Sequence, residues 1–129
     1  MLTTHYAFSG FSVNDLGAAK KFYTEALGLA VVDGKMGNLQ LTLPGGHEVF
    51  IYEKPNHEPA TFTILNFVVD DIDAAVDALN TAGVVTKIYD DPNLPTDEKG
   101  IARGKAADMG PDIAWFRDPA GNVLSVLAD

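Results

Sequence analysis

The chain has no cysteine, few cationic residues and no long apolar run, and each absence excludes a class of protein. Without cysteine there is no disulfide framework, no thiolate nucleophile and no thiolate metal site. No apolar run approaches the roughly 20 residues that a membrane-spanning helix needs. Residues 1–6 also lack the basic and apolar stretches of a signal peptide. We therefore expect a soluble protein that resides in the cytoplasm.

Positive charge is scarce as well. Nine Lys and Arg residues stand against eighteen Asp and Glu residues, a formal net charge of −9 at pH 7. This charge opposes binding to nucleic acid and to anionic membranes, so we predict neither partner. It would favour a cationic ligand, although it also serves ordinary solubility. The 129 residues, 47% of them hydrophobic, suffice for one compact domain with a core.

What the chain does contain is a repeat. The segment that begins Phe11-Ser-Val-Asn-Asp-Leu returns 56 residues later as Phe67-Val-Val-Asp-Asp-Ile. Identical residues at this offset are Phe11/Phe67, Val13/Val69, Asp15/Asp71, Ala18/Ala74, Ala19/Ala75 and Ala26/Ala82. Each copy ends at a glycine, Gly28 or Gly83. Such a repeat indicates one supersecondary unit used twice, with a ligand site expected where the two copies meet.

The first copy is predicted to be a β-α-β-β-β unit. Residues 5–13 are rich in strand-forming side chains. Asn14 or Asp15 can cap a helix, which Gly28 would end in a left-handed conformation. The apolar residues of that helix recur with a period of 3.6: Leu16, Ala19, Phe22, Tyr23, Ala26 and Leu27. Strands are expected at 29–33, 37–43 and 48–53, separated by glycine-containing turns.

The second copy follows a proline-containing linker at 55–59. A strand is expected at 61–69, then a helix capped by Asp71 with apolar residues on one face, then a strand at 84–89. The final strands, 112–117 and 122–127, are joined by an Asp-Pro-Ala-Gly-Asn turn. The long polar segment 90–111, which lies between the expected strands at 84–89 and 112–117, is predicted to be irregular or mobile, either covering a site or simply disordered. The fold class is therefore α+β, one domain over 1–129 with modules at about 1–54 and 60–129.

Three motifs recur in order along the chain: Phe22-Tyr with Leu27-Gly-Leu, Val69-Asp-Asp-Ile-Asp, and Phe116-Arg-Asp-Pro-Ala-Gly-Asn-Val-Leu. Together they resemble the vicinal oxygen chelate superfamily, which contains glyoxalase I, bleomycin-resistance proteins and extradiol dioxygenases. It spans essentially the whole chain and implies two βαβββ modules that form a curved mixed sheet around a cleft. The cleft of such a protein is formed within one chain or across a homodimer. One scaffold carries many chemistries, so the resemblance leaves the function open.

The resemblance also implies where a metal would be held. In metal-dependent members, His or Glu occupies four strand positions, and here those positions carry Phe8, Phe50, Ile64 and Ser125. Divalent cations need nitrogen, sulfur or carboxylate-type oxygen ligands, which this set lacks. The three histidines lie in unrelated contexts and are not expected to replace them. We therefore predict no metal and no cofactor.

Strand alternation then predicts which side chains face the ligand. The predicted ligand-binding residues are Phe8, Phe50, Tyr52, Ile64, Asn66, Trp115, Arg117 and Ser125. Trp115 and Arg117 are chosen over Ala114 and Phe116 because a charged Arg117 would be costly against the helices. The competing interpretation is that Phe8, Phe50 and Ile64 meet and close the cleft as core.

Three functions stay open at this point. A metal-free protein that sequesters a small molecule, similar to the bleomycin-resistance type, fits the aromatic composition of the predicted site. A metal-independent lyase or isomerase could instead use Tyr52, Glu48 or Arg117 for acid–base chemistry. An accessory module with a vestigial cleft is the third. No serine has a histidine at a recognisable activating spacing, which leaves only pairing in space.

Overall fold

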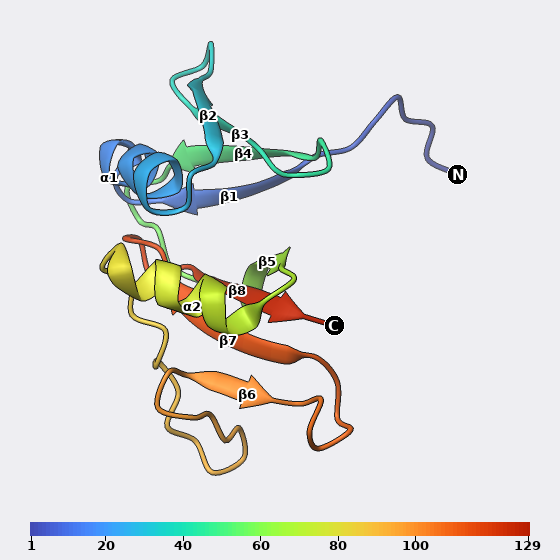
Figure 1. Ribbon diagram of the computed structural model, residues 1–129. Helices are drawn as coiled ribbons and strands as arrows, with labels where there is room; N and C mark the ends of the chain where they lie inside the picture. The colour runs from blue at the N-terminus through green and yellow to red at the C-terminus, as the bar shows by residue number, and fades with distance from the viewer. The chain divides into compact units, whose positions relative to one another are not determined.

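The computed structural model describes all 129 residues and contains eight strands, two α-helices and one π-helical turn (Figure 1). The chain divides into two compact units, Met1–Glu58 and Pro59–Asp129. Each unit has one four-stranded mixed sheet and one helical segment, in the same order along the chain. The predicted α+β class is confirmed. No helix has the length and apolar character that crossing a membrane requires.

In the first unit the strands are β1 (Ser9–Val13), β2 (Ala30–Asp33), β3 (Leu39–Thr42) and β4 (Glu48–Glu53). Their order across the sheet is β1-β4-β3-β2, with β1 parallel to β4 and the other pairs antiparallel. The expected strand at 5–13 is too long, because β4 begins only at Glu48 and its Val49 already pairs with Ser9. In this register Glu48 is the last β4 residue available, to Phe8, and the residues before Phe8 extend past the end of β4.

The helical segment of this unit begins as α1 (Leu16–Lys21) and continues as a π-helical turn, Phe22–Ala26. Asp15, not Asn14, is the cap, since its carboxylate accepts the Ala18 N–H at 3.0 Å. The π turn is closed by the Leu27 N–H, which donates to the Phe22 carbonyl at 3.1 Å. Gly28 has φ +68°, the left-handed stop that the sequence predicts.

One face of the first sheet is covered by this helical segment and forms the core of the unit. The buried side chains on this side are Val13, Leu39, Leu41, Val49 and Ile51, together with Tyr23 of the π turn. Tyr23 contacts Phe11 and Phe22, with ring centroids 6.0 and 5.1 Å away. We call the opposite face of each sheet its helix-free face, because the side chains that alternate with the buried ones point there.

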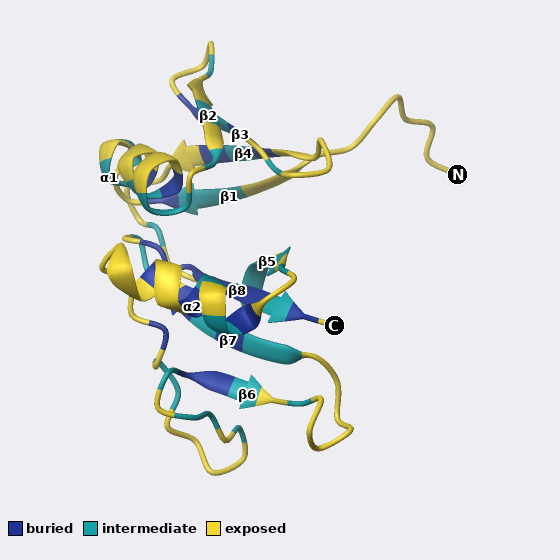
Figure 2. Cartoon of the chain, in the orientation of Figure 1, coloured by how far each residue is buried: buried dark blue, intermediate teal, exposed yellow.

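In the second unit the strands are β5 (Thr63–Val68), β6 (Ile101–Arg103), β7 (Asp112–Arg117) and β8 (Val123–Ala128). The order β5-β8-β7-β6 repeats that of the first unit. The helix α2 (Ile72–Thr81) starts at Asp71, whose carboxylate accepts the Ala74 N–H at 3.0 Å. Its buried residues Ile72, Val76 and Leu79 lie on the side that contacts β7 and β8 (Figure 2). The cap at Asp71 is confirmed.

The expected strand at 84–89 is wrong, and the fourth strand of this sheet comes from the segment that was predicted to be irregular. Thr86 is buried and its hydroxyl donates to the Lys99 carbonyl at 2.7 Å, while Asn80 donates to the same hydroxyl at 2.9 Å. These side-chain bonds hold the chain near Thr86 against Lys99 and Gly100. Ile101, which is fully buried, then takes the place beside β7 and pairs with Ala114.

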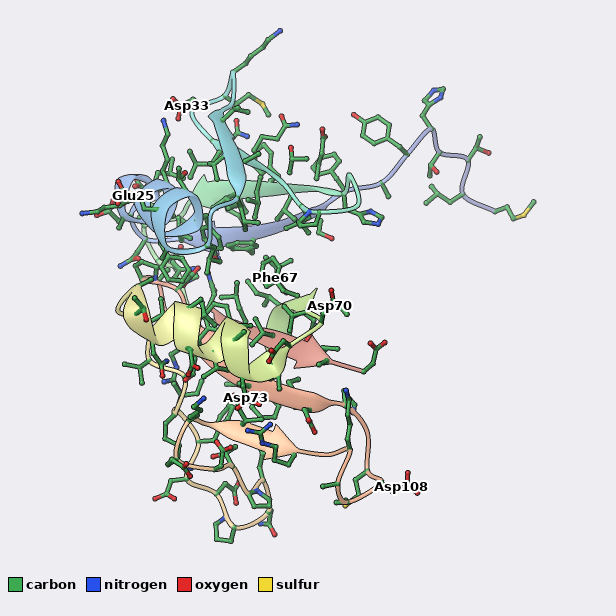
Figure 3. All side chains as sticks on the ribbon, viewed as in Figure 1. Glu25, Asp33, Phe67, Asp70, Asp73 and Asp108 are labelled. Carbon is green, nitrogen blue, oxygen red and sulfur yellow. The ribbon has the colours of Figure 1, made fainter.

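Ion pairs join this β6 region to α2. The Arg103 guanidinium donates two hydrogen bonds to Asp73, at 2.8 and 3.1 Å, and Lys99 lies 2.8 Å from Asp77. Figure 3 shows Asp73 on the side of α2 that faces β6. The hydrogen bond from Arg103 is the main reason that the pKa of Asp73 falls from 3.8 to about 2.

The turn between β7 and β8 has the geometry expected from its sequence. Asp118 accepts the backbone N–H groups of Ala120 and Asn122, each at 2.9 Å. Gly121 has φ +85°, which only glycine adopts without strain. The turn therefore sets the register of the β7–β8 pair, in which Trp115 lies opposite Ser125.

Candidate functional site

Four aromatic rings lie together along the helix-free face of the first sheet, and we call them the aromatic stripe. Phe50 and Tyr52 belong to β4, whereas Tyr6 and Phe8 belong to the segment that precedes β1. Successive ring centroids are 6.2 Å apart for Tyr6–Phe8, 6.3 Å for Phe8–Phe50 and 6.0 Å for Phe50–Tyr52. These spacings are those of interacting aromatic pairs. The sequence predicted Phe8, Phe50 and Tyr52 as ligand contacts, and the structure brings these three together.

The aromatic stripe is solvent-accessible for most of its length. Tyr6, Phe8 and Tyr52 are 76%, 59% and 40% exposed. Gly10 lies opposite Phe50 across the β1–β4 pair and places no side chain over it. A contiguous group of exposed aromatic rings is unusual on a protein surface, which makes the aromatic stripe a candidate interaction surface.

Beyond Gly10 on the same face is Ser12, which pairs with Tyr52 in the sheet. The Ser12 hydroxyl lies 2.6 Å from Nδ1 of His57, which belongs to the turn after β4. Sequence reasoning missed this contact because the two residues are 45 positions apart and share no motif. Glu53, at the end of β4, instead accepts the Leu16 N–H at 3.1 Å at the start of α1.

The helix-free face of the second sheet is polar where the first is aromatic. Asn66, Ser125 and Trp115 are neighbours in one row across β5, β8 and β7. Ser125 is fully buried, and its hydroxyl donates to the Asn66 amide oxygen at 2.5 Å. The Trp115 Nε1–H donates to the Thr63 hydroxyl at 3.2 Å. Asn66 and Ser125 thus form one hydrogen-bonded pair, whose exposed member is Asn66.

Trp115 lies on the side of β7 that the charge argument assigned to it. Its neighbours in sequence, Ala114 and Phe116, are fully buried on the side that faces α2. Arg117, two residues after Trp115, is exposed. Tyr89 packs edge-on against Trp115 with centroids 5.2 Å apart, a contact that the sequence analysis did not foresee. Tyr89 is the last residue of the segment that was wrongly predicted to be a strand, so alternation could not place its ring.

Ile64 departs from simple alternation. The register of β5 against β8 shifts between Thr63 and Leu65, a bulge that leaves Ile64 without a partner opposite. The neighbouring residue Thr63 accepts the Trp115 Nε1–H with its hydroxyl. The role of Ile64 in ligand binding stays a prediction.

A separate pocket of about 330 Å³ lies in the second unit, near the C-terminal end of α2. It is lined by Asn80, Gly83, Val84, Val85, Thr86, Lys87, Glu98 and Lys99. None of the eight predicted ligand-binding residues lines it. Lys99 is engaged by Asp77, and Lys87 donates to Thr96, so the amines of this pocket are already paired.

Comparison with known proteins identifies the family. The model of the Glyoxalase/Bleomycin resistance protein/Dioxygenase superfamily matches residues 4–126. The chain belongs to this superfamily. The family predicted from the motifs is thereby confirmed. No curated protein matches the chain.

Several solved structures share the fold. TnmS3, an antibiotic binding protein from Streptomyces sp. CB03234, is 25% identical, with 98% of each chain covered and a TM-score of 0.65. The fosfomycin resistance protein FosX from Listeria monocytogenes is 14% identical, with 99% and 95% covered and a TM-score of 0.70. An integron cassette protein from the mobile metagenome of V. Cholerae is 22% identical, with 99% and 98% covered and a TM-score of 0.63.

The residues at the four positions that the family resemblance assigns to metal ligands do not fit a divalent cation. Phe8 and Phe50 present only ring carbons, and their rings contact each other. The Ser125 hydroxyl is committed to Asn66. No group of three or more His, Asp or Glu side chains elsewhere in the structure could hold a metal ion.

Proposed function

We propose that the protein is a metal-independent small-molecule-binding member of its superfamily that sequesters an aromatic ligand. The aromatic stripe carries this proposal, because it presents contiguous rings to solvent on a face that its own helix leaves uncovered. Exposed rings contribute stacking and apolar burial to an incoming ligand. Their prior contact with one another also lowers the conformational entropy that binding would cost.

The lack of metal-binding side chains at the positions where the resemblance predicts metal ligands supports the same conclusion. The positions that the family resemblance assigns to metal ligands carry Phe8, Phe50, Ile64 and Ser125, whose side chains offer one neutral hydroxyl and no nitrogen or carboxylate donor. The 25% identity to TnmS3, which is described as an antibiotic binding protein, also supports a binding role. The similarity to FosX concerns the fold alone.

The proposed ligand contacts are the eight predicted residues, three in the first unit and five in the second, and the contacts of each unit are proposed for that unit by itself. Phe8, Phe50, Tyr52 and Ile64 supply apolar contact. Asn66 supplies an amide whose oxygen Ser125 already occupies, so its N–H groups are oriented to donate to a ligand oxygen. Trp115 and Arg117 supply an aromatic ring and a guanidinium on the same face of β7.

A ligand screen tests the binding role. We expect at least one member of a panel of aromatic antibiotics to raise the melting temperature and to bind by calorimetry. Phe50→Ala should weaken that binding about tenfold or more through lost stacking. Met36→Ala removes an exposed apolar side chain from the turn after β2, outside the stripe, and should leave affinity unchanged. Equal affinities for the Phe50→Ala and unsubstituted proteins would disprove the role of the stripe.

The absence of a required metal is tested separately. Elemental analysis of protein purified without a histidine tag should find no stoichiometric zinc, iron, nickel or manganese. Ligand affinity should be unchanged after dialysis against a chelator. About one metal ion per chain, retained when the three histidines are substituted, would refute metal independence even if the ligand binds.

A further inference from the structure

The Ser12 hydroxyl and the His57 ring form a preassembled pair beside the aromatic stripe. Their 2.6 Å separation between Oγ and Nδ1 is within the range of a nucleophile and its general base. Both residues are half-buried, so the pair is partly shielded from water and still accessible.

The position of His57 is determined by backbone hydrogen bonds. The Lys54 N–H donates to the Val13 carbonyl at 2.9 Å, directly beside Ser12. The His57 N–H donates to the Lys54 carbonyl at 3.0 Å and closes the turn. The turn that carries His57 is therefore attached to the end of the strand that carries Ser12, and the pair does not depend on a flexible loop.

A ligand on the aromatic stripe would have access to Ser12. Ser12 lies on the helix-free face, since its neighbours Phe11 and Val13 point to the helical side. Gly10, two residues earlier on the same face, has no side chain to block the approach. Tyr52, the last ring of the stripe, is the residue paired with Ser12 across the sheet.

We propose that Ser12 is a nucleophile and His57 its general base, and that this pair transfers the acyl group of an aryl ester. The aromatic part of such an ester would lie on the stripe, so the substrate class rests on the proposed function. The chemistry itself rests on the Ser12–His57 geometry alone.

The reaction needs only the ester and water. Ser12 Oγ forms a bond to the carbonyl carbon while its proton passes to Nδ1 of His57, and the carbonyl electrons move to oxygen. As the carbonyl re-forms, the bond to the alcohol oxygen breaks and that oxygen takes the proton from His57. Water then attacks the acyl-serine in the same way, which releases the acid and restores the Ser12 hydroxyl.

Mass spectrometry with two probes tests the assignment. Incubation with an alkyl fluorophosphonate should displace fluoride and leave one phosphonyl group on Ser12, located by peptide mapping. With p-nitrophenyl acetate, the protein should release nitrophenolate in an initial burst and carry an acetyl group on Ser12. Ser12→Ala and His57→Gln should each lower the rate about 100-fold, the usual worth of general-base assistance.

Matched controls exclude trivial reactivity and loss of folding. Ser9→Ala and His47→Gln change the same residue types in the same unit and should react at the original rate. Binding of the hits from the ligand screen by Ser12→Ala shows that the variant is folded. An adduct on a histidine or on Ser9, or a rate that Ser12→Ala does not change, would overturn the assignment. Loss of aromatic-ligand binding with Ser12 labelling intact would instead count against the proposed function.

Discussion

The two units share one topology and differ on the face that their helices leave uncovered. The first unit carries four aromatic rings in contact, whereas the second carries hydrogen-bonded pairs, Ser125 with Asn66 and Trp115 with Thr63. On the helical side the units are alike, since each has an aspartate cap and buried aliphatic side chains. The features common to both units therefore lie on the helical side, where they form the core, whereas the residues on the helix-free face differ between the units.

A second difference lies in how each sheet obtains its last strand. In the first unit β2 follows shortly after the helical segment, at Ala30. In the second unit α2 ends at Thr81 and the corresponding edge strand begins only at Ile101. The intervening chain is held by side-chain hydrogen bonds and ion pairs instead of a strand ladder. The two sheets therefore have the same strand order although the segments that lead to their edge strands differ in length and in what holds them.

The largest loss of stability should come from the face of β7 that packs against α2, and a much smaller one from the opposite face. Phe116→Ala removes a fully buried ring and should lower the free energy of unfolding by about 4 kcal/mol. Trp115→Phe should cost much less stability, because Trp115 is only partly buried, yet it should weaken ligand binding more. Chemical denaturation and calorimetry measure both quantities. The reverse pattern would show that Trp115 is a core residue.

The next largest loss of stability is expected where Gly100 packs against Thr86, a contact found only in the second unit. Gly100 has φ +88°, and a Cβ there would lie 2.0 Å from the Thr86 carbonyl oxygen. Gly100→Ala should therefore destabilise the protein by about 3 kcal/mol, from left-handed strain plus the clash. Gly83 has a similar φ of +86° but open space around it, so Gly83→Ala should cost only about 1 kcal/mol. Equal losses in denaturation experiments would contradict the close approach at Thr86.

A smaller and symmetrical effect is expected at the helix caps. Asp15→Ala and Asp71→Ala each remove a side-chain acceptor from an N-terminal N–H, which should cost about 1 kcal/mol. Asp15→Asn and Asp71→Asn keep an acceptor oxygen and serve as controls with smaller losses. Denaturant midpoints compare the four variants. A loss confined to one unit would show that the repeat is not equivalent at its caps.

The smallest effect is a pH dependence found in the second unit. The pKa of Asp73 is about 2 in the folded protein, below its ordinary 3.8, because Arg103 donates hydrogen bonds to it. Between these values the unfolded state binds more protons, so this contribution is present above pH 3.8 and is lost as pH falls through about 2. Asp73→Asn and Arg103→Met should both flatten stability-versus-pH curves in that window. Unchanged curves would show that the ion pair contributes nothing to the acid response.

Much of the fold could be predicted from the sequence because its signals are local. The caps at Asp15 and Asp71, the left-handed Gly28 and the Asp118 turn each depend on residues within a few positions of one another. Alternation likewise placed Phe8, Phe50 and Tyr52 on one face of the first sheet. Such signals need no knowledge of distant chain segments.

The errors arose where distant segments compete. Residues 84–89 have strand-like composition, but the bonds of Thr86 to Lys99 and Asn80 draw them away from the ladder, and Ile101 occupies the edge instead. The bulge at Ile64 likewise follows from the register against β8, which the local pattern of β5 does not specify.

By itself the sequence determined the superfamily, the repeated module, the helix cap at Asp71 and the residue types at the positions that the family resemblance assigns to metal ligands. These follow from residue identity and short spacing, which act through hydrogen bonds and alternation within one element. Only the tertiary structure decided which segment completes the second sheet, that Tyr89 meets Trp115, and that Ser12 meets His57. The physical reason is that each of these depends on which of several distant partners best satisfies a buried or half-buried group, and that choice is made only when the chain is packed.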